Sequence, residues 1–73
     1  MVIVYTTPGC QPCRATKRAL HQRGIAYEEI DLTQDVAALE LVRSWGYHSA
    51  PVVYLGPDHH WHGYRPDLIA GLT

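Results

Sequence analysis

Short apolar runs recur along the chain and alternate with segments whose apolar residues fall on one helical face. β-Branched and aromatic residues fill these runs, and turn signals such as Thr7-Pro8-Gly9 and Gly56-Pro57-Asp58 bound them, which is typical of strands. Strands are expected over residues 2–5, 25–31, 52–55 and 59–62. Only the turn at residues 56–58 separates the last two strands, so they predict an antiparallel hairpin.

Three further segments have the pattern of helices. They span residues 11–23, 35–45 and 66–72. Pro12 and Pro66 fall in first turns, where the missing N–H of proline is harmless, while Gly24 and Gly46 follow the first two helices as stop signals. The middle helix has a clear apolar face, made by Ala38, Leu41, Val42 and Trp45.

The middle helix is expected to begin at a side-chain cap formed by Thr33 or Asp35, and Trp45 at its far end is expected in the core. The helix that joins the first two strands makes them parallel, because such a crossover returns the chain in the same direction. The order βαβαββα therefore predicts one α/β domain over residues 1–73, with a four-stranded mixed sheet and three helices.

Composition and charge narrow the class of protein. The chain is 47% hydrophobic and 18% charged, as in ordinary globular domains, and its formal net charge is −1. This balance argues against nucleic acid or an anionic membrane as a partner. The apolar runs are short and no basic leader precedes the first strand, so neither a signal peptide nor a membrane span is expected. These features favour a monomer in the cytoplasm.

The candidate chemistry lies in the segment Cys10-Gln11-Pro12-Cys13, which contains both cysteines of the chain. One C-x-x-C pair closes almost no loop, so it favours a chemical role in a reducing compartment over a structural one. The helix dipole and the free amide of Cys13 stabilise a thiolate at Cys10, whose pKa is expected below that of an ordinary thiol and below that of Cys13. Further positive charge comes from Arg14, Lys17 and Arg18.

This arrangement predicts thiol–disulfide exchange, with Cys10 as the nucleophile and Cys13 as the resolving cysteine. A single pair cannot supply the four ligands of a structural zinc site, and Arg14 rather than histidine follows Cys13, so a haem attachment site is excluded. The three cations of the helix are either an ordinary solvated face or a surface that attracts an acidic segment of a partner.

The chain resembles the glutaredoxin-like redoxins of the NrdH type along nearly its whole length. The matching segments are Val4-Tyr5-Thr6, residues 15–20 (Ala-Thr-Lys-Arg-Ala-Leu), Gly46-Tyr47, residues 50–53 (Ala-Pro-Val-Val) and Trp61-x-Gly63-Tyr64-Arg65-Pro66-Asp67. The resemblance implies a thioredoxin fold, no cofactor, and electron transfer from thioredoxin reductase to class Ib ribonucleotide reductase. The chain departs from the family pattern at Thr7, His62 and Tyr64, where the family usually has Lys, Ser and Phe. It also departs in the dipeptide Gln11-Pro12, whose proline before Cys13 resembles thioredoxin.

The resemblance also implies a partner-binding surface around the cysteines. Its expected residues are Pro8, Gln11, Pro12, Ala50, Pro51, Trp61, Gly63, Tyr64 and Arg65. The Ala50–Pro51 peptide bond is expected to be cis and to lie against the cysteines, where an extended segment of the target can pair with the backbone of Ala50. Trp61 is expected to pack under or recognise the loop that follows it.

Two alternatives remain open at this point. One is a glutathione-dependent glutaredoxin, although no glutathione pocket is evident in Thr7, Pro51 or residues 63–67. The other is a metal or iron–sulfur module that uses the cysteines together with His59, His60 and His62, of which the last two are expected on one face of a strand. His48 could also reach the cysteines as a proton carrier.

Overall fold

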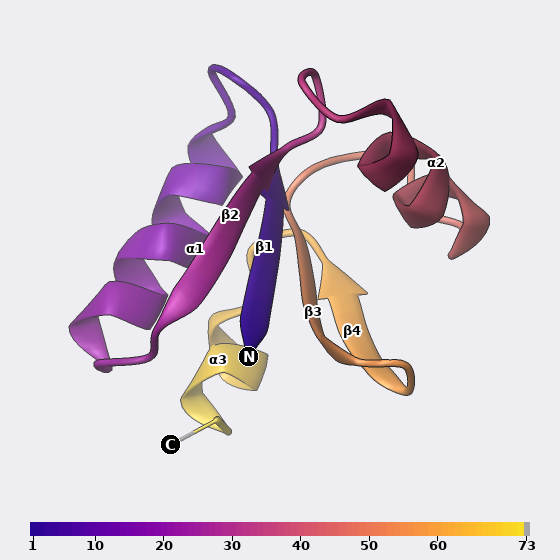
Figure 1. Ribbon diagram of the computed structural model, residues 1–73. Coiled ribbons are helices and arrows are strands. Elements are labelled where there is room, and N and C mark those ends of the chain that lie inside the picture. The colour runs from indigo at the N-terminus through magenta and orange to yellow at the C-terminus, as the bar shows by residue number, and fades with distance from the viewer. Residues whose placement is uncertain (73) are drawn as a thin grey trace.

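A four-stranded mixed sheet forms the centre of the molecule, which the computed structural model describes over residues 1–72 (Figure 1). The elements are β1 (Val2–Thr6), α1 (Gln11–Gln22), β2 (Tyr27–Asp31), α2 (Val36–Ser44), β3 (Val52–Gly56), β4 (His59–His62) and α3 (Pro66–Ala70). The predicted order βαβαββα is confirmed.

The strands lie in the order β2-β1-β3-β4. β1 and β2 are parallel, from Val2 opposite Tyr27 to Thr6 opposite Asp31, whereas β1 pairs with β3 and β3 with β4 in antiparallel fashion. The ladder between β3 and β4 is irregular between Tyr54 and Gly56. The predicted parallel pair and the predicted hairpin are therefore both confirmed.

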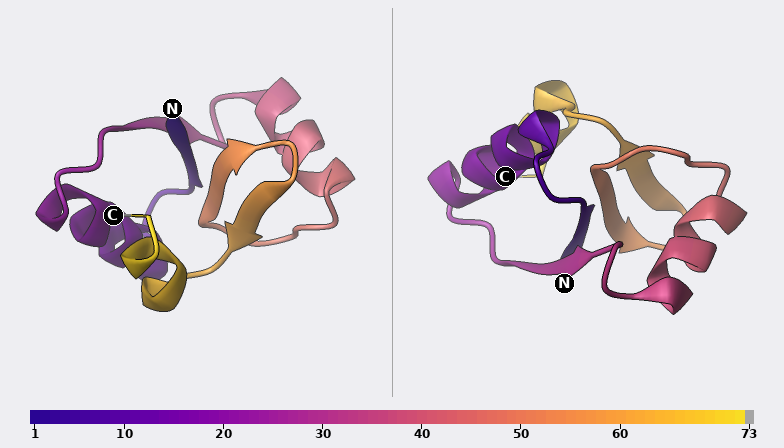
Figure 2. Two further views of the ribbon diagram at one scale, coloured as in Figure 1. Left: turned by 90° about the horizontal axis from the view of Figure 1, so that it is seen from below. Right: turned by 90° about the horizontal axis from the view of Figure 1, so that it is seen from above.

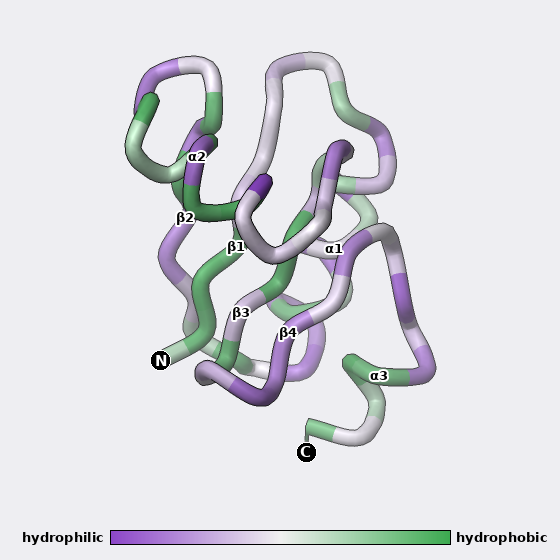
Figure 3. Tube along the Cα trace, turned by 90° about the vertical axis from the view of Figure 1, so that its right-hand side faces the viewer, coloured by the Kyte–Doolittle hydropathy of each residue, from purple (hydrophilic) through white to green (hydrophobic). Residues whose placement is uncertain are grey.

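The helices cover both faces of the sheet: α1 and α3 lie on one face and α2 on the other (Figure 2). Alternate residues of the strands supply the two cores. The core under α1 and α3 contains Val2, Val4, Leu20, Val53, Trp61 and Ile69. The core under α2 contains Tyr5, Leu32, Ala38, Val42 and Val52. A strand covered on both faces is apolar throughout, which explains the unbroken apolar run of β1, whereas the edge strand β4 is hydrophilic (Figure 3).

The ends of two helices correct the predicted boundaries. Ile25 does not begin a strand, because its N–H donates to the carbonyl of Leu20 while the N–H of Gly24 donates to His21, which closes α1. This is the hydrogen-bond pattern of a Schellman motif, with Gly24 at φ +69°. β2 therefore begins at Tyr27 rather than at residue 25. The same pattern closes α2.

The other corrections are small. α1 ends at Gln22 because Arg23 is its C-cap, and β1 extends to Thr6, whose carbonyl accepts the N–H of Leu32. α3 ends at Ala70 rather than at residue 72, since Gly71 caps it. No helix among residues 1–72 is long and apolar enough to cross a membrane.

Asp35 is the cap of α2, and Thr33 is not. The Oδ1 atom of Asp35 accepts the N–H of Ala38 at 2.9 Å, whereas Thr33 donates its N–H and hydroxyl to Asp31. Asp35→Ala is expected to lower the free energy of unfolding by about 1 kcal/mol, because the N–H of Ala38 then loses its partner. Urea unfolding followed by circular dichroism measures the difference. Asp35→Asn keeps the capping oxygen, so an equal loss in that variant would contradict the capping role.

Candidate active site

The two cysteines form a disulfide at the N-terminal end of α1. Cys10 is the N-cap and is half-buried, whereas Cys13 in the first turn is only 2% exposed. The N–H of Cys13 donates to the Sγ atom of Cys10 at 3.1 Å. Cys10 therefore occupies the outer position and receives the amide expected to stabilise its thiolate, and Cys13 lies behind it. The lowered pKa of Cys10 stays a prediction for the reduced protein.

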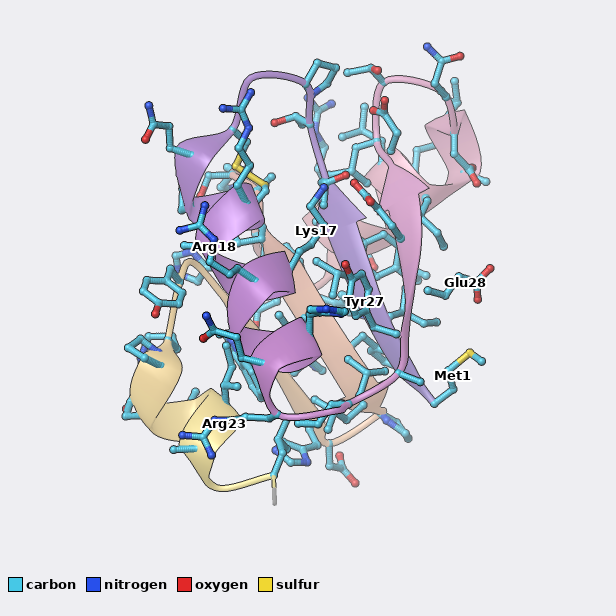
Figure 4. The ribbon with its side chains drawn as sticks, turned by 90° about the vertical axis from the view of Figure 1, so that its left-hand side faces the viewer. Met1, Lys17, Arg18, Arg23, Tyr27 and Glu28 are labelled. Atoms are coloured by element: carbon cyan, nitrogen blue, oxygen red, sulfur yellow. A yellow bond between two sulfur atoms is a disulfide. The ribbon has the colours of Figure 1, made fainter. Side chains whose placement is uncertain are left out.

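A hollow of about 230 Å³ adjoins the disulfide. Its lining residues come from the β1–α1 loop, α1 and β2: Thr6, Thr7, Pro8, Gly9, Cys10, Cys13, Arg14, Lys17, Glu29 and Asp31. The Nζ atom of Lys17 lies 3.0 Å from the Oε2 atom of Glu29, and the buried hydroxyl of Thr6 donates to the same oxygen at 2.9 Å. Figure 4 shows Lys17 extending from α1 toward the strands.

The charge of Lys17 acts directly on Glu29. The hydrogen bond from Lys17 holds the pKa of the Glu29 carboxyl below its usual value, partial burial opposes this effect, and the bond from Thr6 adds to it. Glu29 is therefore a carboxylate at neutral pH. Sequence reasoning missed Glu29 and Thr6 as neighbours of the cysteines, because the parallel register of β1 and β2 brings them together across more than twenty residues of chain.

The Ala50–Pro51 peptide bond is cis, as expected. Pro51 is fully buried, and its carbonyl accepts the N–H of Gly63 at 2.8 Å. Gly63 adopts φ +84°, a conformation that suits glycine. The structure thus brings two of the predicted partner-binding segments, residues 50–51 and residue 63, into contact. Within residues 1–72 the backbone of Ala50 makes no hydrogen bond.

A second hollow, of about 380 Å³, lies on the other side of Thr7. Its lining residues are Thr7, Leu32, Leu39, Val42, Arg43, Tyr47, His48, Ser49 and Ala50. Thr7 lines both hollows, so they meet at the loop before Cys10. The sequence did not predict this hollow. His48 lines it and does not line the hollow around the cysteines, so the structure lends no support to a role for His48 as proton carrier.

The remaining predicted partner-binding residues lie in different environments. Trp61 is buried in the core under α1 and α3, which supports the packing role. Tyr64 is 42% exposed. Arg65 forms two hydrogen bonds with Asp67, at 3.2 and 2.9 Å, which hold the pKa of Asp67 below its usual value. Gln11 and Pro12 are exposed in the first turn of α1, next to the cysteines.

The histidines of β4 pack against aromatic rings. His60 and His62 share one face of the strand, where both contact Tyr47, and the Nδ1 atom of His60 lies 2.8 Å from the Tyr47 hydroxyl. His59 lies against Trp61, which belongs to the opposite face. Among residues 1–72, no three His, Cys, Asp or Glu side chains lie together as metal ligands would. Within residues 1–72 of one chain, the histidines and cysteines therefore do not gather into a common site.

Trp45 packs against the core under α2 and not within it, so the predicted core position is confirmed only in part. Its indole stacks on Tyr54 and on His60, with ring centroids 5.0 Å apart in each pair, and meets Tyr5 edge-on. The side chain is half-buried at the border of the core under α2. Trp45 thus belongs to the packing of the sheet and not to the surroundings of the cysteines.

Comparisons with known proteins agree with this geometry. The glutaredoxin family model matches residues 2–60. The glutaredoxin-like protein NrdH of Escherichia coli K12 is 41% identical over 71 residues, which cover 97% of this chain and 86% of that protein.

Two solved structures extend the likeness to three dimensions. The NrdH-redoxin of Escherichia coli superposes with a TM-score of 0.93 at 40% identity, over 99% of this chain and 93% of its own. The thioredoxin-like protein BC3987 superposes with a TM-score of 0.87 at 31% identity over the full length of both chains. The expected thioredoxin fold is therefore confirmed. By sequence and by structure, the chain belongs to the glutaredoxin family and, within it, to the NrdH-type glutaredoxin-like redoxins.

Proposed function

We propose that the protein is a dithiol–disulfide oxidoreductase that carries electrons from a thioredoxin reductase to class Ib ribonucleotide reductase in the cytoplasm. The observation that carries the proposal is the Cys10–Cys13 disulfide at the N-terminus of α1, with Cys10 in the outer position and Cys13 buried behind it. Membership of the NrdH-type redoxins supports the pairing of donor and acceptor, and the proteins of this family and fold are thiol–disulfide oxidoreductases.

The proposed reaction begins with the reduced protein. The thiolate of Cys10 attacks one sulfur of the target disulfide, a mixed disulfide forms, and the other target sulfur leaves as a thiolate that takes a proton from water. The thiol of Cys13 then loses its proton and attacks the Cys10 sulfur. The Cys10–Cys13 bond forms, the bond to the target breaks, and the target leaves with both of its sulfurs reduced. Thioredoxin reductase returns the two electrons.

The surface around Cys10 supports a polypeptide partner. Pro8, Gln11 and Pro12 are exposed beside Cys10, and the unpaired backbone of Ala50 offers hydrogen bonds to an extended chain. We infer that the target segment lies across this surface, with its reactive sulfur at Cys10. Exposed Tyr64, next to Gly63, would extend the contact.

A second candidate, a glutathione-dependent glutaredoxin, is favoured by one observation. The hollow of about 380 Å³ beside Thr7 and Ala50 is large enough for part of a small peptide, and Arg43 offers it a positive charge. Against it, position 7 holds threonine where the family usually has lysine, which removes a second cation from that side of the cysteines.

The test is reduction of an insulin-type protein disulfide with NADPH, in parallel through thioredoxin reductase and through glutathione with glutathione reductase. The proposal expects turnover with thioredoxin reductase, little with glutathione, and support of ribonucleotide reduction by the class Ib enzyme. Activity mainly with glutathione that survives Cys13→Ser would instead establish the second candidate. No activity with either reductase would refute both.

A further inference from the structure

The hollow beside the disulfide collects charges of both signs. Its four charged side chains are Arg14, Lys17, Glu29 and Asp31. Two are positive and two negative, so their formal charges sum to zero. Replacing any one of them by a neutral residue changes the electric field at the cysteines. Asp31 is held by hydrogen bonds from the N–H and hydroxyl of Thr33, at 2.8 and 2.7 Å, and Arg14 is exposed. Lys17 and Glu29 are the pair that bonds across the hollow.

Lys17 and Glu29 line the same hollow as Cys13. Lys17 follows Cys13 by four residues on α1, so the two side chains lie on the same face of the helix, one turn apart. Glu29 approaches from β2 and is held by two donors on one oxygen, Lys17 and the buried hydroxyl of Thr6. The ammonium group is therefore held at the wall of the hollow, where it remains partly exposed to water.

We propose that Lys17 and Glu29 are opposing positioning residues for Cys13: the ammonium of Lys17 favours the Cys13 thiolate, and the carboxylate of Glu29 limits that effect. This rests on the proposed dithiol function and deepens it. Together the two residues set how readily Cys13 completes the reaction and how strongly the reduced protein donates electrons. In this proposal both residues act through Cys13.

The step concerned is the attack of Cys13 on the mixed disulfide. Cys13 must release its proton to water before its sulfur bonds to Cys10 and the target sulfur leaves with the electron pair of the broken bond. A nearby positive charge lowers the free energy of the thiolate, and a nearby negative charge raises it. Because the Lys17 and Glu29 side chains are 29% and 41% exposed, water screens both effects and keeps them moderate.

The two substitutions separate an electrostatic role from a structural one. Lys17→Met and Glu29→Gln break the same ion pair, so a purely structural contribution changes the reactivity of Cys13 in the same direction in both variants. The proposed role requires the reactivity of Cys13 to change in opposite directions in the two variants. Lys17→Met is expected to raise the pKa of Cys13, and Glu29→Gln is expected to lower it, while the double variant lies between them.

The experiment measures the alkylation rate of Cys13 against pH in the Cys10→Ser protein. Below the pKa, the rate is expected to fall by about two- to tenfold in Lys17→Met and to rise by a similar factor in Glu29→Gln. Lys17→Arg keeps the charge and should retain the unsubstituted profile. Glu28→Gln is the matched control, because Glu28 is the next residue of β2 and points away from α1 (Figure 4).

A second measurement uses the chain with both cysteines, equilibrated with a glutathione redox buffer and trapped with a thiol reagent. The dithiol form is expected to be favoured in Glu29→Gln and disfavoured in Lys17→Met, where a tenfold change equals about 30 mV. Shifts of the same sign in both variants, or no shift, would overturn the proposal. If the two variants shift the equilibrium in opposite directions but neither reductase reduces the protein, the proposed role of Lys17 and Glu29 stands. The proposed electron transfer is then refuted.

Discussion

Cys10→Ser is expected to lose at least about a thousandfold of the disulfide-reducing activity, because it removes the only sulfur in the outer position of the site. Cys13→Ser is expected to behave differently. It retains the attacking thiolate, so the first step proceeds, but no second sulfur releases the target. The mixed disulfide between Cys10 and the target therefore accumulates.

Mass spectrometry of the non-reduced protein, mixed with a peptide that carries one disulfide, distinguishes these outcomes. Cys13→Ser should gain the mass of the whole peptide, attached through one of its two sulfurs, and Cys10→Ser should not. Circular dichroism should show both variants folded, because the disulfide closes only a short loop and contributes little to stability. An adduct at Cys13 in the Cys10→Ser protein, formed as fast as the adduct at Cys10, would contradict the assigned roles.

Leu20→Ala is expected to lower the free energy of unfolding by about 2–5 kcal/mol. The Leu20 side chain is fully buried between α1 and the sheet, in the core that α3 completes. Truncation loses the buried apolar area and leaves a cavity that a core of this size cannot refill. Since domains of this length are only marginally stable, the variant should be substantially unfolded near 37 °C.

Guanidinium unfolding followed by circular dichroism at 222 nm gives the free energies. Leu41→Ala is the matched control, because the same chemical change occurs on α2 at a side chain that is 44% exposed. It is expected to cost less than about 1 kcal/mol. Equal losses in the two variants would show that the core under α1 does not carry the stability assigned to it.

The order of elements was predictable because each one has a local signal. The apolar run of β1, the proline in the first turn of α1 and the glycines after α1 and α2 are all visible in the sequence. The boundaries were less accurate. Ile25 has the β-branched side chain of a strand residue, yet its N–H is used to close α1, so the strand starts later. Strand propensity does not reveal which carbonyl accepts the hydrogen bond from a given backbone N–H.

In the candidate site, too, only the features with local geometry were predictable from the sequence. Cys10 and Cys13 were identified from the sequence because their geometry is local: a spacing of three residues on one helical turn brings the sulfurs together. The cis bond before Pro51 was expected only from resemblance to a family. The contact of Pro51 with Gly63 and the hollow between Thr7 and Arg43 were not predicted, since each joins segments far apart in the chain.

The sequence by itself determined the class of fold, the cysteine pair and which of the two cysteines lies outermost, because periodicity, turn residues and helix position act over a few residues. Only the tertiary structure decided which charges surround the pair. The parallel register of β1 and β2 places Glu29 beside Thr6, and the packing of α1 on the sheet brings Lys17 to the same carboxylate. Electrostatic effects depend on distance in space and not along the chain, so they emerge only when the strands are paired and the helix is docked.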